Sequence, residues 1–555
     1  MTDLADATAE GIDRRAFVTR AMIAGVAITL PLACKPDSGP ATAAGTPRRA
    51  PGVPAVDDLF ELTIAAARER METGTLTSRA LTQRYLTRID AMDKRGPAVN
   101  AMIELNVDAL AIADAMDAER KAGTVRGPLH GIPVLIKDNI DTADKMRTSA
   151  GSLALASSTP ARDAFIVERL RAAGAVLLGK TNLSEWANFR STRSSSGWSG
   201  RGGQTRNPYV LDRNPCGSSS GTGAALASDF ATVGVGTETD GSILCPASLN
   251  GLVGVKPTVG LWGRSGIIPI SASQDTAGPM TRTVADAAAL LTALVGLDPR
   301  DDATGRRPAN ADSDYTNGLD AAGLQGARIG VARNLAGFNP DVDRALNAAV
   351  AALRAAGATI VDPADLAGAG KFDDAEFEVL LYEFKDGLNR YFAALGDSAP
   401  VKTLAELIAW NEKETVREMP WFGQEILVMA EKRGPLTEPA YLAARAKCVR
   451  MARTEGIDAT IAKHSLDAIV FPSNAPAWLT DHLNGDHFVG GNTSFAAVAG
   501  YPAVTVPMGL VHELPVGLTF TGRAWSEAVL LKYAYAFEQL TKARRAPKYF
   551  ATLEA

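Results

Sequence analysis

The sequence predicts a mixed α/β fold in which helices cover both faces of a β-sheet. Short apolar runs that are typical of buried strands, at 131–136 and 175–178, alternate with helical segments such as 163–173. The 555 residues are 46% hydrophobic and 21% charged, the balance of an ordinary globular protein, and the length suffices for one large domain or two to three ordinary ones. Alternation of strands and helices along such a chain builds a sheet between two layers of helices.

Helical patterns flank these strands. From 56 to 121, apolar residues recur at helical spacing, and Thr77 is placed to cap the second helix of this region. Residues 365–465 are rich in helix formers and predict a helical insertion, which either covers the functional site or is a purely structural cap. Three further strands and a closing helix are expected near the C-terminus, at 468–471, 503–507, 516–520 and 528–540.

The first 33 residues have the features of an export signal. Residues 13–18, Asp-Arg-Arg-Ala-Phe-Val, resemble a twin-arginine motif, and an apolar run follows from 21 to 33. A helix of that length is about 20 Å long, which is too short to cross a hydrocarbon core of about 30 Å. We therefore expect residues 1–33 to be a signal peptide and the protein to be periplasmic or otherwise extracytoplasmic. An ordinary amphipathic helix that begins after Asp13 is the alternative.

A short tether separates this signal from the folded domain, which is expected at 56–555. Residues 34–55 are rich in Pro, Gly, Ala and Thr, a composition typical of a flexible linker. The string Leu32-Ala33-Cys34 resembles a lipoprotein cleavage site, and a lipid on Cys34 is the only membrane contact that the sequence suggests. Pro31 departs from that pattern, and plain cleavage after a small residue is the alternative.

The composition argues against nucleic-acid, metal and cofactor binding. The formal net charge is −5 and the isoelectric point about 5.7, whereas nucleic-acid-binding domains are basic. The chain has five histidines and no H-E-x-x-H motif, so we expect no zinc site. The cysteines include no C-x-x-C pair and are too few for a disulfide framework in a chain of this length: Cys34, Cys216, Cys245 and Cys448.

Two motifs match well-known sites but fail on local structure. Gly174–Thr181 fits the phosphate-binding pattern G-x-x-x-x-G-K-[ST], yet its middle residues are themselves an apolar strand and not an exposed loop. Gly217–Gly221 fits the nucleophile elbow G-x-S-x-G with Ser219 at its centre. Turn-forming residues precede it in place of a strand, although histidines follow, and an esterase that uses Ser219 and a histidine is kept as an alternative.

A long segment rich in Ser and Gly, 191–223, lies between apolar, patterned flanks, and such a segment inside a compact domain is usually functional. It contains the first of three blocks that together resemble the amidase signature family: Pro215-Cys-Gly-Ser-Ser-Ser-Gly-Thr-Gly223, Gly236-Thr-Glu-Thr-Asp-Gly-Ser-Ile-Leu-Cys-Pro246 and Gly251-Leu-Val-Gly-Val-Lys-Pro-Thr258. Gly131–Asn139 resembles the strand that bears the family's catalytic lysine. The resemblance extends over residues 57–545 and implies the amidase-signature fold.

This resemblance implies a Ser–cis-Ser–Lys triad that hydrolyses carboxamides to an acid and ammonia or an amine. Ser242 aligns with the nucleophile and Lys137 with the base. Ser218, 24 residues before Ser242, aligns with the serine that relays protons between them. A cis peptide bond is implied between Gly217 and Ser218.

The residue types suit this chemistry. A serine hydroxyl needs a base to become a nucleophile, and a lysine with its ordinary pKa of about 10.4 is protonated at neutral pH. Burial disfavours the charged ammonium and lowers that pKa. Lys137 follows the apolar residues 134–136, which would bury it. From the strand alone, a surface charge or an ion pair with Asp138 is the alternative.

The turn before the nucleophile is expected to bind the oxyanion that forms during the reaction. Thr239, Asp240 and Gly241 would aim backbone N–H groups at that oxygen. Many relatives carry Gly where Asp240 stands, and Asp240 either contacts Lys137 or fixes the turn. Cys245, shortly after the nucleophile, is expected to be a buried structural thiol.

Within the family, residues 199–208 and 267–276 look closest to peptide amidases, which release ammonia from C-terminal peptide amides. Aryl, aliphatic and lactam-derived amides are the alternative substrates. A further alternative is a non-catalytic or partner-dependent homologue, such as the glutamine-hydrolysing component of a transfer-RNA-charging complex. The export signal and the complete triad argue against it.

Overall fold

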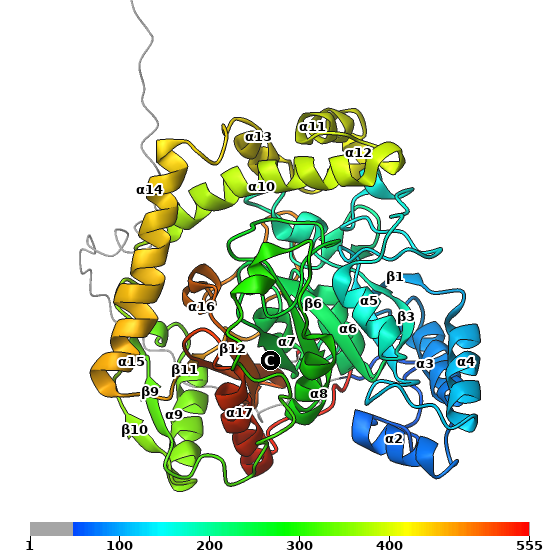
Figure 1. The fold of residues 1–555 in the computed structure, drawn as a ribbon, viewed down its shortest axis with the longest axis horizontal. Coiled ribbons are helices and arrows are strands. Elements are labelled where there is room, and N and C mark those ends of the chain that lie inside the picture. Colours follow the sequence, from blue (N-terminus) through cyan, green and yellow to red (C-terminus); the bar gives the residue numbers. More distant parts are fainter. Residues whose placement is uncertain (1–47, 554–555) are drawn as a thin grey trace, which may run out of the picture. The chain divides into compact units, whose positions relative to one another are not determined.

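The computed structural model describes residues 48–553, so the predicted export signal, Cys34 and most of the tether lie outside the described residues. An eleven-stranded sheet forms the centre of the fold, and helices surround it (Figure 1). Its strands follow the order β1 (Met102–Leu105), β3 (Val176–Thr181), β2 (Pro133–Lys137), β6 (Val233–Glu238), β8 (Thr276–Thr281), β7 (Val253–Lys256), β12 (Ala503–Val511), β13 (Leu514–Thr521), β11 (Ala468–Pro472), β9 (Arg328–Val331) and β10 (Thr359–Val361).

The sheet is mixed, as predicted. β2 pairs in parallel with β3 and β6, whereas β8 pairs antiparallel with β6 and β7. Because β2, β3 and β6 run in the same direction, their carboxyl ends meet at one edge of the sheet. The residues that follow these strands are therefore brought together, although they are far apart in the sequence.

Helices cover both faces of the sheet. In β13, Phe520 packs against Phe537 of α17 (Glu527–Thr541), with ring centroids 6.2 Å apart. Gly517, three residues earlier, faces Ser248 of α7 (Leu244–Leu249), since a Cβ at this glycine would lie 2.8 Å from the Ser248 hydroxyl. Residues three apart on a strand point to opposite faces, so α17 and α7 lie on opposite sides. Other helices around the sheet are α2 (Ile64–Glu72), α3 (Ser78–Met92), α4 (Ala109–Lys121), α5 (Phe165–Ala172), α6 (Ser220–Ala227), α8 (Val284–Leu294), α9 (Pro340–Ala355) and α16 (Ser494–Ala499).

Residues 365–465 are mostly helical. They form α10 (Asp373–Leu395), α11 (Leu404–Lys413), α12 (Thr415–Glu418), α13 (Glu425–Glu431), α14 (Pro439–Cys448), the π-helical stretch Val449–Asp458 and α15 (Ala459–His464). α10 crosses the edge of the sheet where β2 and β6 end (Figure 1). Near its end, Tyr391 donates to Asp141, four residues beyond β2 (2.8 Å). Near its start, Glu376 is bridged by Gln274 to Thr239, the residue after β6. The insertion therefore contacts both loops at this edge.

The region 56–121 differs in one respect from its helical prediction. Thr77 caps α3 as expected, with its hydroxyl accepting from the backbone N–H of Ala80 (3.0 Å). Met102–Leu105, however, forms the edge strand β1, which pairs with β3. A four-residue strand is too short to interrupt a helical pattern visibly, and its partner lies far along the chain.

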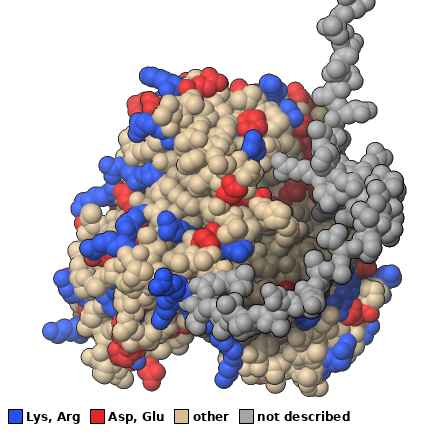
Figure 2. Space-filling model, turned by 180° about the vertical axis from the view of Figure 1, so that it is seen from behind, with Lys and Arg blue, Asp and Glu red and all other residues tan. Residues whose placement is uncertain are grey.

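Within residues 48–553, no helix is long and apolar enough to cross a membrane. Figure 2 shows Lys and Arg side chains interspersed with Asp and Glu side chains on one face of the molecule. On that face the charges are mixed, unlike the basic stripe typical of nucleic-acid-binding proteins.

Candidate active site

Lys137 is the last residue of β2 and is completely buried. Its Nζ lies 2.7 Å from Ser218 Oγ, 2.9 Å from Thr237 Oγ1 and 3.2 Å from the Thr237 carbonyl oxygen. No carboxylate of the described chain forms an ion pair with this amine, and Asp138 pairs with Arg201 (3.4 Å). The surface charge and the Lys137–Asp138 ion pair that the strand alone allowed are therefore both wrong.

Burial lowers the pKa of Lys137 to about 7, although Glu238 and Asp275 act in the opposite direction. Glu238 is engaged elsewhere, because it accepts from two backbone N–H groups at the start of α7 (2.7 and 2.9 Å). A substantial fraction of Lys137 is thus neutral at neutral pH. A neutral amine keeps a lone pair, so it can accept a proton from the Ser218 hydroxyl.

Ser218 lies between Lys137 and the loop that carries Ser242. The Gly217–Ser218 peptide bond is cis, as the family resemblance implies. Ser218 is fully buried, and its carbonyl accepts from the N–H of Ser184 (3.0 Å). Only glycine fits at position 217, since a Cβ there would lie 2.1 Å from Ser184 Oγ. Contacts on both sides of the bond therefore fix the backbone that presents the Ser218 hydroxyl.

Ser242 lies in the loop after β6 and is 7% exposed. Its carbonyl accepts from the N–H of Ser219 (3.1 Å), whereas its hydroxyl makes no hydrogen bond with any described residue. The structure thus places Lys137 and Ser218 in direct contact and ties Ser242 to the residue next to Ser218. The Ser242 hydroxyl is left free to contact a ligand.

The loop before Ser242 presents unused backbone donors. Among residues 48–553, the N–H groups of Thr239, Asp240, Gly241 and Ser242 donate to no other group. Gly241 has a φ of +79°, and a Cβ there would lie 2.8 Å from Thr493 Oγ1, so the turn requires glycine. A run of free N–H groups beside a serine hydroxyl can bind an oxyanion.

Asp240 fixes this turn and does not contact Lys137. Its Oδ1 accepts from Thr493 Oγ1 (2.5 Å), and its Oδ2 accepts from Ser494 Oγ (2.6 Å). Both partners lie at the start of α16. Of the two roles that the sequence left open for Asp240, the contacts support the one that holds the loop in place.

A second carboxyl, Glu376 of α10, lies against Asp240, and no sequence pattern indicated it. Gln274 Nε2 donates to Glu376 Oε1 (2.8 Å) and to the Thr239 carbonyl (3.3 Å). Burial raises the pKa of both carboxyls, and repulsion by Asp240 raises that of Glu376 further. Both carboxyls therefore keep a proton to higher pH than free carboxyls do, and a proton shared by the pair limits the negative charge next to the loop of residues 239–242.

A cavity of about 200 Å³ opens beside these residues. Thr237 and Thr239 line it next to the nucleophile loop, and Ile267–Ile270 forms an apolar wall, which Asp275 holds by accepting from the Ile270 N–H (2.9 Å). Asn139 Nδ2 donates to Thr237 Oγ1 (3.0 Å), while its buried Oδ1 has no partner among the described residues. The apolar wall makes the cavity suited to an apolar group of a ligand.

The two motifs that fail on local structure, one of them kept as an alternative, have structural contacts. The Ser219 hydroxyl donates to the Thr237 carbonyl (3.1 Å) and accepts from the Thr237 N–H (3.2 Å), and no histidine in the described chain contacts it. In Gly174–Thr181, all residues from Val176 onward belong to the buried strand β3, where Lys180 donates to the carbonyl of Ile140 (2.9 Å). Residues 48–553 contain no group of three or more side chains that could hold a metal ion.

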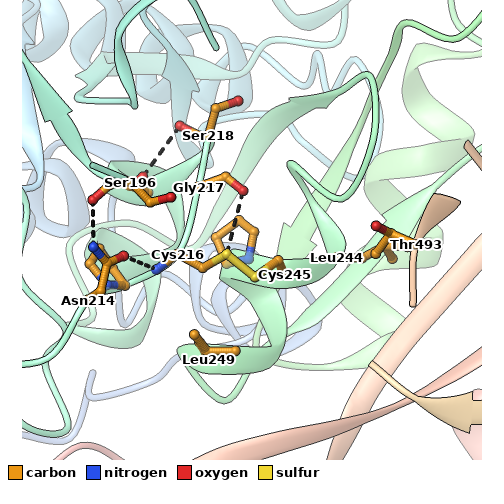
Figure 3. The surroundings of a disulfide bond; sticks show 12 residues. Ser196, Asn214, Cys216, Gly217, Ser218, Leu244, Cys245, Leu249 and Thr493 are labelled. Carbon is orange, nitrogen blue, oxygen red and sulfur yellow. Dashed lines mark hydrogen bonds between the residues drawn. A yellow bond between two sulfur atoms is a disulfide. The ribbon is translucent and has the colours of Figure 1, made fainter. Parts of the chain in front are cut away.

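Cys216 and Cys245 form a disulfide, which corrects the expectation that Cys245 is a free buried thiol (Figure 3). Their Cα atoms are 6.0 Å apart across 29 residues of sequence, and Cys448 stays free and buried. Pairing depends on proximity in space, which cysteine spacing does not reveal. One signal was available: each cysteine lies within three residues of a serine of the predicted triad, so the meeting of Ser218 and Ser242 implies that the cysteines also meet.

Proteins similar to this chain include bacterial and plant amidases. Residues 80–531 match the family described as Amidase. A probable amidase of Arabidopsis thaliana is 42% identical over 505 residues, which are 88% of this chain and 92% of the relative. The X-ray structure of the peptide amidase from Stenotrophomonas maltophilia shares 54% sequence identity with a TM-score of 0.85, and the match covers 88% of this chain and 99% of that chain. A glutamyl-tRNA(Gln) amidotransferase component of Roseiflexus castenholzii is 36% identical over 502 residues, 87% of this chain and 96% of the relative.

Replacing Glu376 by Gln tests the shared proton. Because the pKa of Glu376 is raised on folding, the folded chain binds more protons than the unfolded chain above the unfolded pKa of about 4.3. Stability contributed by this group therefore falls as the pH rises from 5 to 8. Gln keeps the size of the side chain without a charge to bury. We expect the melting temperature of Glu376→Gln relative to wild type to be higher at pH 8 than at pH 5 by about 2 °C.

Scanning calorimetry at the two pH values measures this difference. Glu378→Gln is the matched control on the same helix, since Glu378 forms a partly exposed ion pair with Arg433 (2.8 Å). It should show no such gain at pH 8. A Glu376→Gln variant whose melting temperature follows that of wild type at both pH values would contradict the shared proton.

Proposed function

The chain belongs to the amidase family and hydrolyses amide C–N bonds, and from that premise we propose that its substrates are peptides with a C-terminal carboxamide. The resemblance of residues 199–208 and 267–276 to peptide amidases, together with 54% identity to a peptide amidase, supports this substrate class. The observation that carries the mechanism is the contact of a buried lysine, with its pKa near 7, with a serine beside the nucleophile loop.

In the proposed mechanism, Lys137 is the base and Ser242 the nucleophile. Neutral Lys137 takes the proton of Ser218, which takes the proton of Ser242, and Ser242 Oγ attacks the carboxamide carbon. The free N–H groups of residues 239–242 bind the oxygen that becomes negative. Ser218 then returns a proton to the departing nitrogen, and ammonia leaves behind an acyl-enzyme on Ser242. Water then attacks the acyl-enzyme and gives its proton to the same relay, and the peptide acid is released.

The cavity beside the loop is proposed to hold the residue next to the scissile amide. Its wall at Ile267–Ile270 suits an apolar side chain.

We also propose that the protein is exported, as its N-terminal sequence suggests. The Cys216–Cys245 disulfide supports an oxidising compartment, because disulfides are rare in the reduced cytosol. Export argues against a role in a transfer-RNA-charging complex, which is cytoplasmic. Intact-mass measurement of the protein secreted by its native host is the test: a start at or shortly after residue 34 is expected, and an uncleaved chain would contradict export.

The substrate proposal predicts conversion of amidated peptides to acids. Purified protein incubated with a mixture of C-terminally amidated peptides should release ammonia and convert them to free acids, as followed by mass spectrometry. Peptides that end in an apolar residue should react fastest. Ser242→Ala should reduce the rate by at least about 10³-fold, and Ser219→Ala should retain turnover within about tenfold. If simple aliphatic or aryl amides react while no peptide does, the peptide proposal is wrong.

The assignment of Lys137 predicts a pH dependence. The base must be unprotonated, so kcat/KM should rise with pH through about 7 and level off above it, with about tenfold loss per pH unit below. Lys137→Ala should lower kcat/KM by about 10³-fold or more and remove this rise.

Lys256 provides a matched control for this profile. It is also buried, with a pKa lowered by burial to about 8, but it donates to the carbonyl of Tyr501 (2.8 Å), away from the serines. Lys256→Gln should keep the rise near pH 7. A profile that loses its rise in the Lys256 variant and keeps it in the Lys137 variant would overturn the assignment.

A further inference from the structure

The disulfide joins the two segments that carry the serines of the proposed triad. Cys216 precedes Ser218 by two residues, and Cys245 follows Ser242 by three. Figure 3 shows the bond between the loop of Gly217 and Ser218 and the start of α7. A covalent link this close to both hydroxyls constrains their separation more directly than a link elsewhere in the fold.

The surroundings of the bond transmit that constraint to the two loops. The Cys216 N–H donates to Asn214 Oδ1 (2.8 Å), and the Cys245 N–H donates to the Gly241 carbonyl (2.8 Å). Asn250 Nδ2 spans both segments, with the Pro215 carbonyl at 2.9 Å and the Pro246 carbonyl at 2.7 Å. The disulfide is the covalent part of a set of contacts that fasten one loop to the other.

Few noncovalent contacts connect the loop of Ser218 directly with the loop of Ser242. One backbone hydrogen bond, from Ser219 N–H to the Ser242 carbonyl (3.1 Å), connects the two loops at the triad, and the Ser242 hydroxyl has no partner among the described residues. Proton relay requires the hydroxyl oxygens to come within about 2.6–3.2 Å of each other. A shift of about 1 Å in such a site costs roughly 10²-fold in rate.

From this arrangement we infer that the Cys216–Cys245 disulfide is a positioning element for catalysis, which holds Ser218 and Ser242 in register for proton transfer. Full activity then requires the oxidised chain. The inference rests on the proposed mechanism, and it assigns the two cysteines no contact with the substrate. Loss of the bond should slow formation of the acyl-enzyme and leave substrate binding nearly unchanged.

Reduction of the bond is a balanced exchange. A dithiol reductant supplies two electrons and two protons, breaks the S–S bond, leaves two cysteine thiols and itself becomes a cyclic disulfide. Cys216 and Cys245 are only 5% and 4% exposed, so reductants reach the folded protein slowly. A variant is therefore a cleaner probe than added reductant.

The test compares three full-length proteins: wild type, Cys216→Ser/Cys245→Ser, and Cys448→Ala as the cysteine control. Each is assayed well below its own melting temperature for kcat and KM on a peptide amide and for the rate of fluorophosphonate labelling of Ser242. We expect the double variant to lose about 10- to 100-fold in kcat and in labelling rate, with KM within about twofold. Cys448→Ala should behave as wild type.

A lower melting temperature of the double variant with unchanged kcat and labelling rate would overturn the inference, because the bond would then act on stability alone. Labelling of Ser242 needs no amide substrate, so it distinguishes failure of the proposed mechanism from failure of the inference about the disulfide. Wild type that is not labelled at Ser242 contradicts the proposed mechanism, whereas equal labelling of wild type and double variant contradicts only the inference.

If the double variant does not fold, wild-type chain made in a host with a reducing cytoplasm replaces it. Its thiols are counted and its labelling rate is measured before and after oxidation by oxidised glutathione. A rise in labelling rate that accompanies the loss of two thiols supports the inference. A rate that does not change as the bond closes contradicts it.

Discussion

Lys137 is buried with no carboxylate in contact, and the rest of the site depends on this arrangement. The neighbouring residues keep the nearby carboxylates away from the amine. An amine among opposite charges would stay protonated, whereas one surrounded by hydroxyl and carbonyl oxygens loses its proton more easily because burial penalises the ammonium form. The carboxyls near this site all have other partners. Glu238 accepts from the start of α7, Asp138 pairs with Arg201, and Asp240 binds α16. The fold thereby keeps this lysine apart from the negative charges that would hold its proton.

The lysine and the two serines come from separate parts of the chain, and the fold brings these parts together. β2 ends at Lys137, the loop before α6 carries Ser218, and the loop after β6 carries Ser242. The parallel strands β2 and β6 set the first and third of these next to each other. Hydrogen bonds, the disulfide and the contact of α10 with the loop of residues 239–242 then hold the loops in place. The helical insertion is thus part of the support of the site as well as a layer over it.

Much of this could be predicted from the sequence, and the parts that could not share a physical cause. The apolar runs at 131–136 and 175–178 correspond to β2 and β3, and the spacing of Ser218 and Ser242 within recognisable blocks pointed to their roles. β1 was missed because a short edge strand is stabilised mainly by pairing with its neighbour, here β3. Glu376 was missed because its role depends on contact with Asp240, a residue far away in the sequence. The disulfide was missed because it also joins residues that are distant in the sequence. Local sequence patterns reveal periodicity and motifs, whereas contacts between residues distant in the sequence become visible only in the structure.

The central claim is that a substantial fraction of Lys137 is neutral near pH 7 in the folded protein. Its titration can be followed directly by NMR of isotope-labelled lysine side chains, with a Lys137→Met variant to identify the signal. The account predicts a midpoint at about 7. A midpoint near the ordinary lysine value of about 10.4 would mean that Lys137 is protonated when the enzyme works, and that the relay through Ser218 does not begin with this residue.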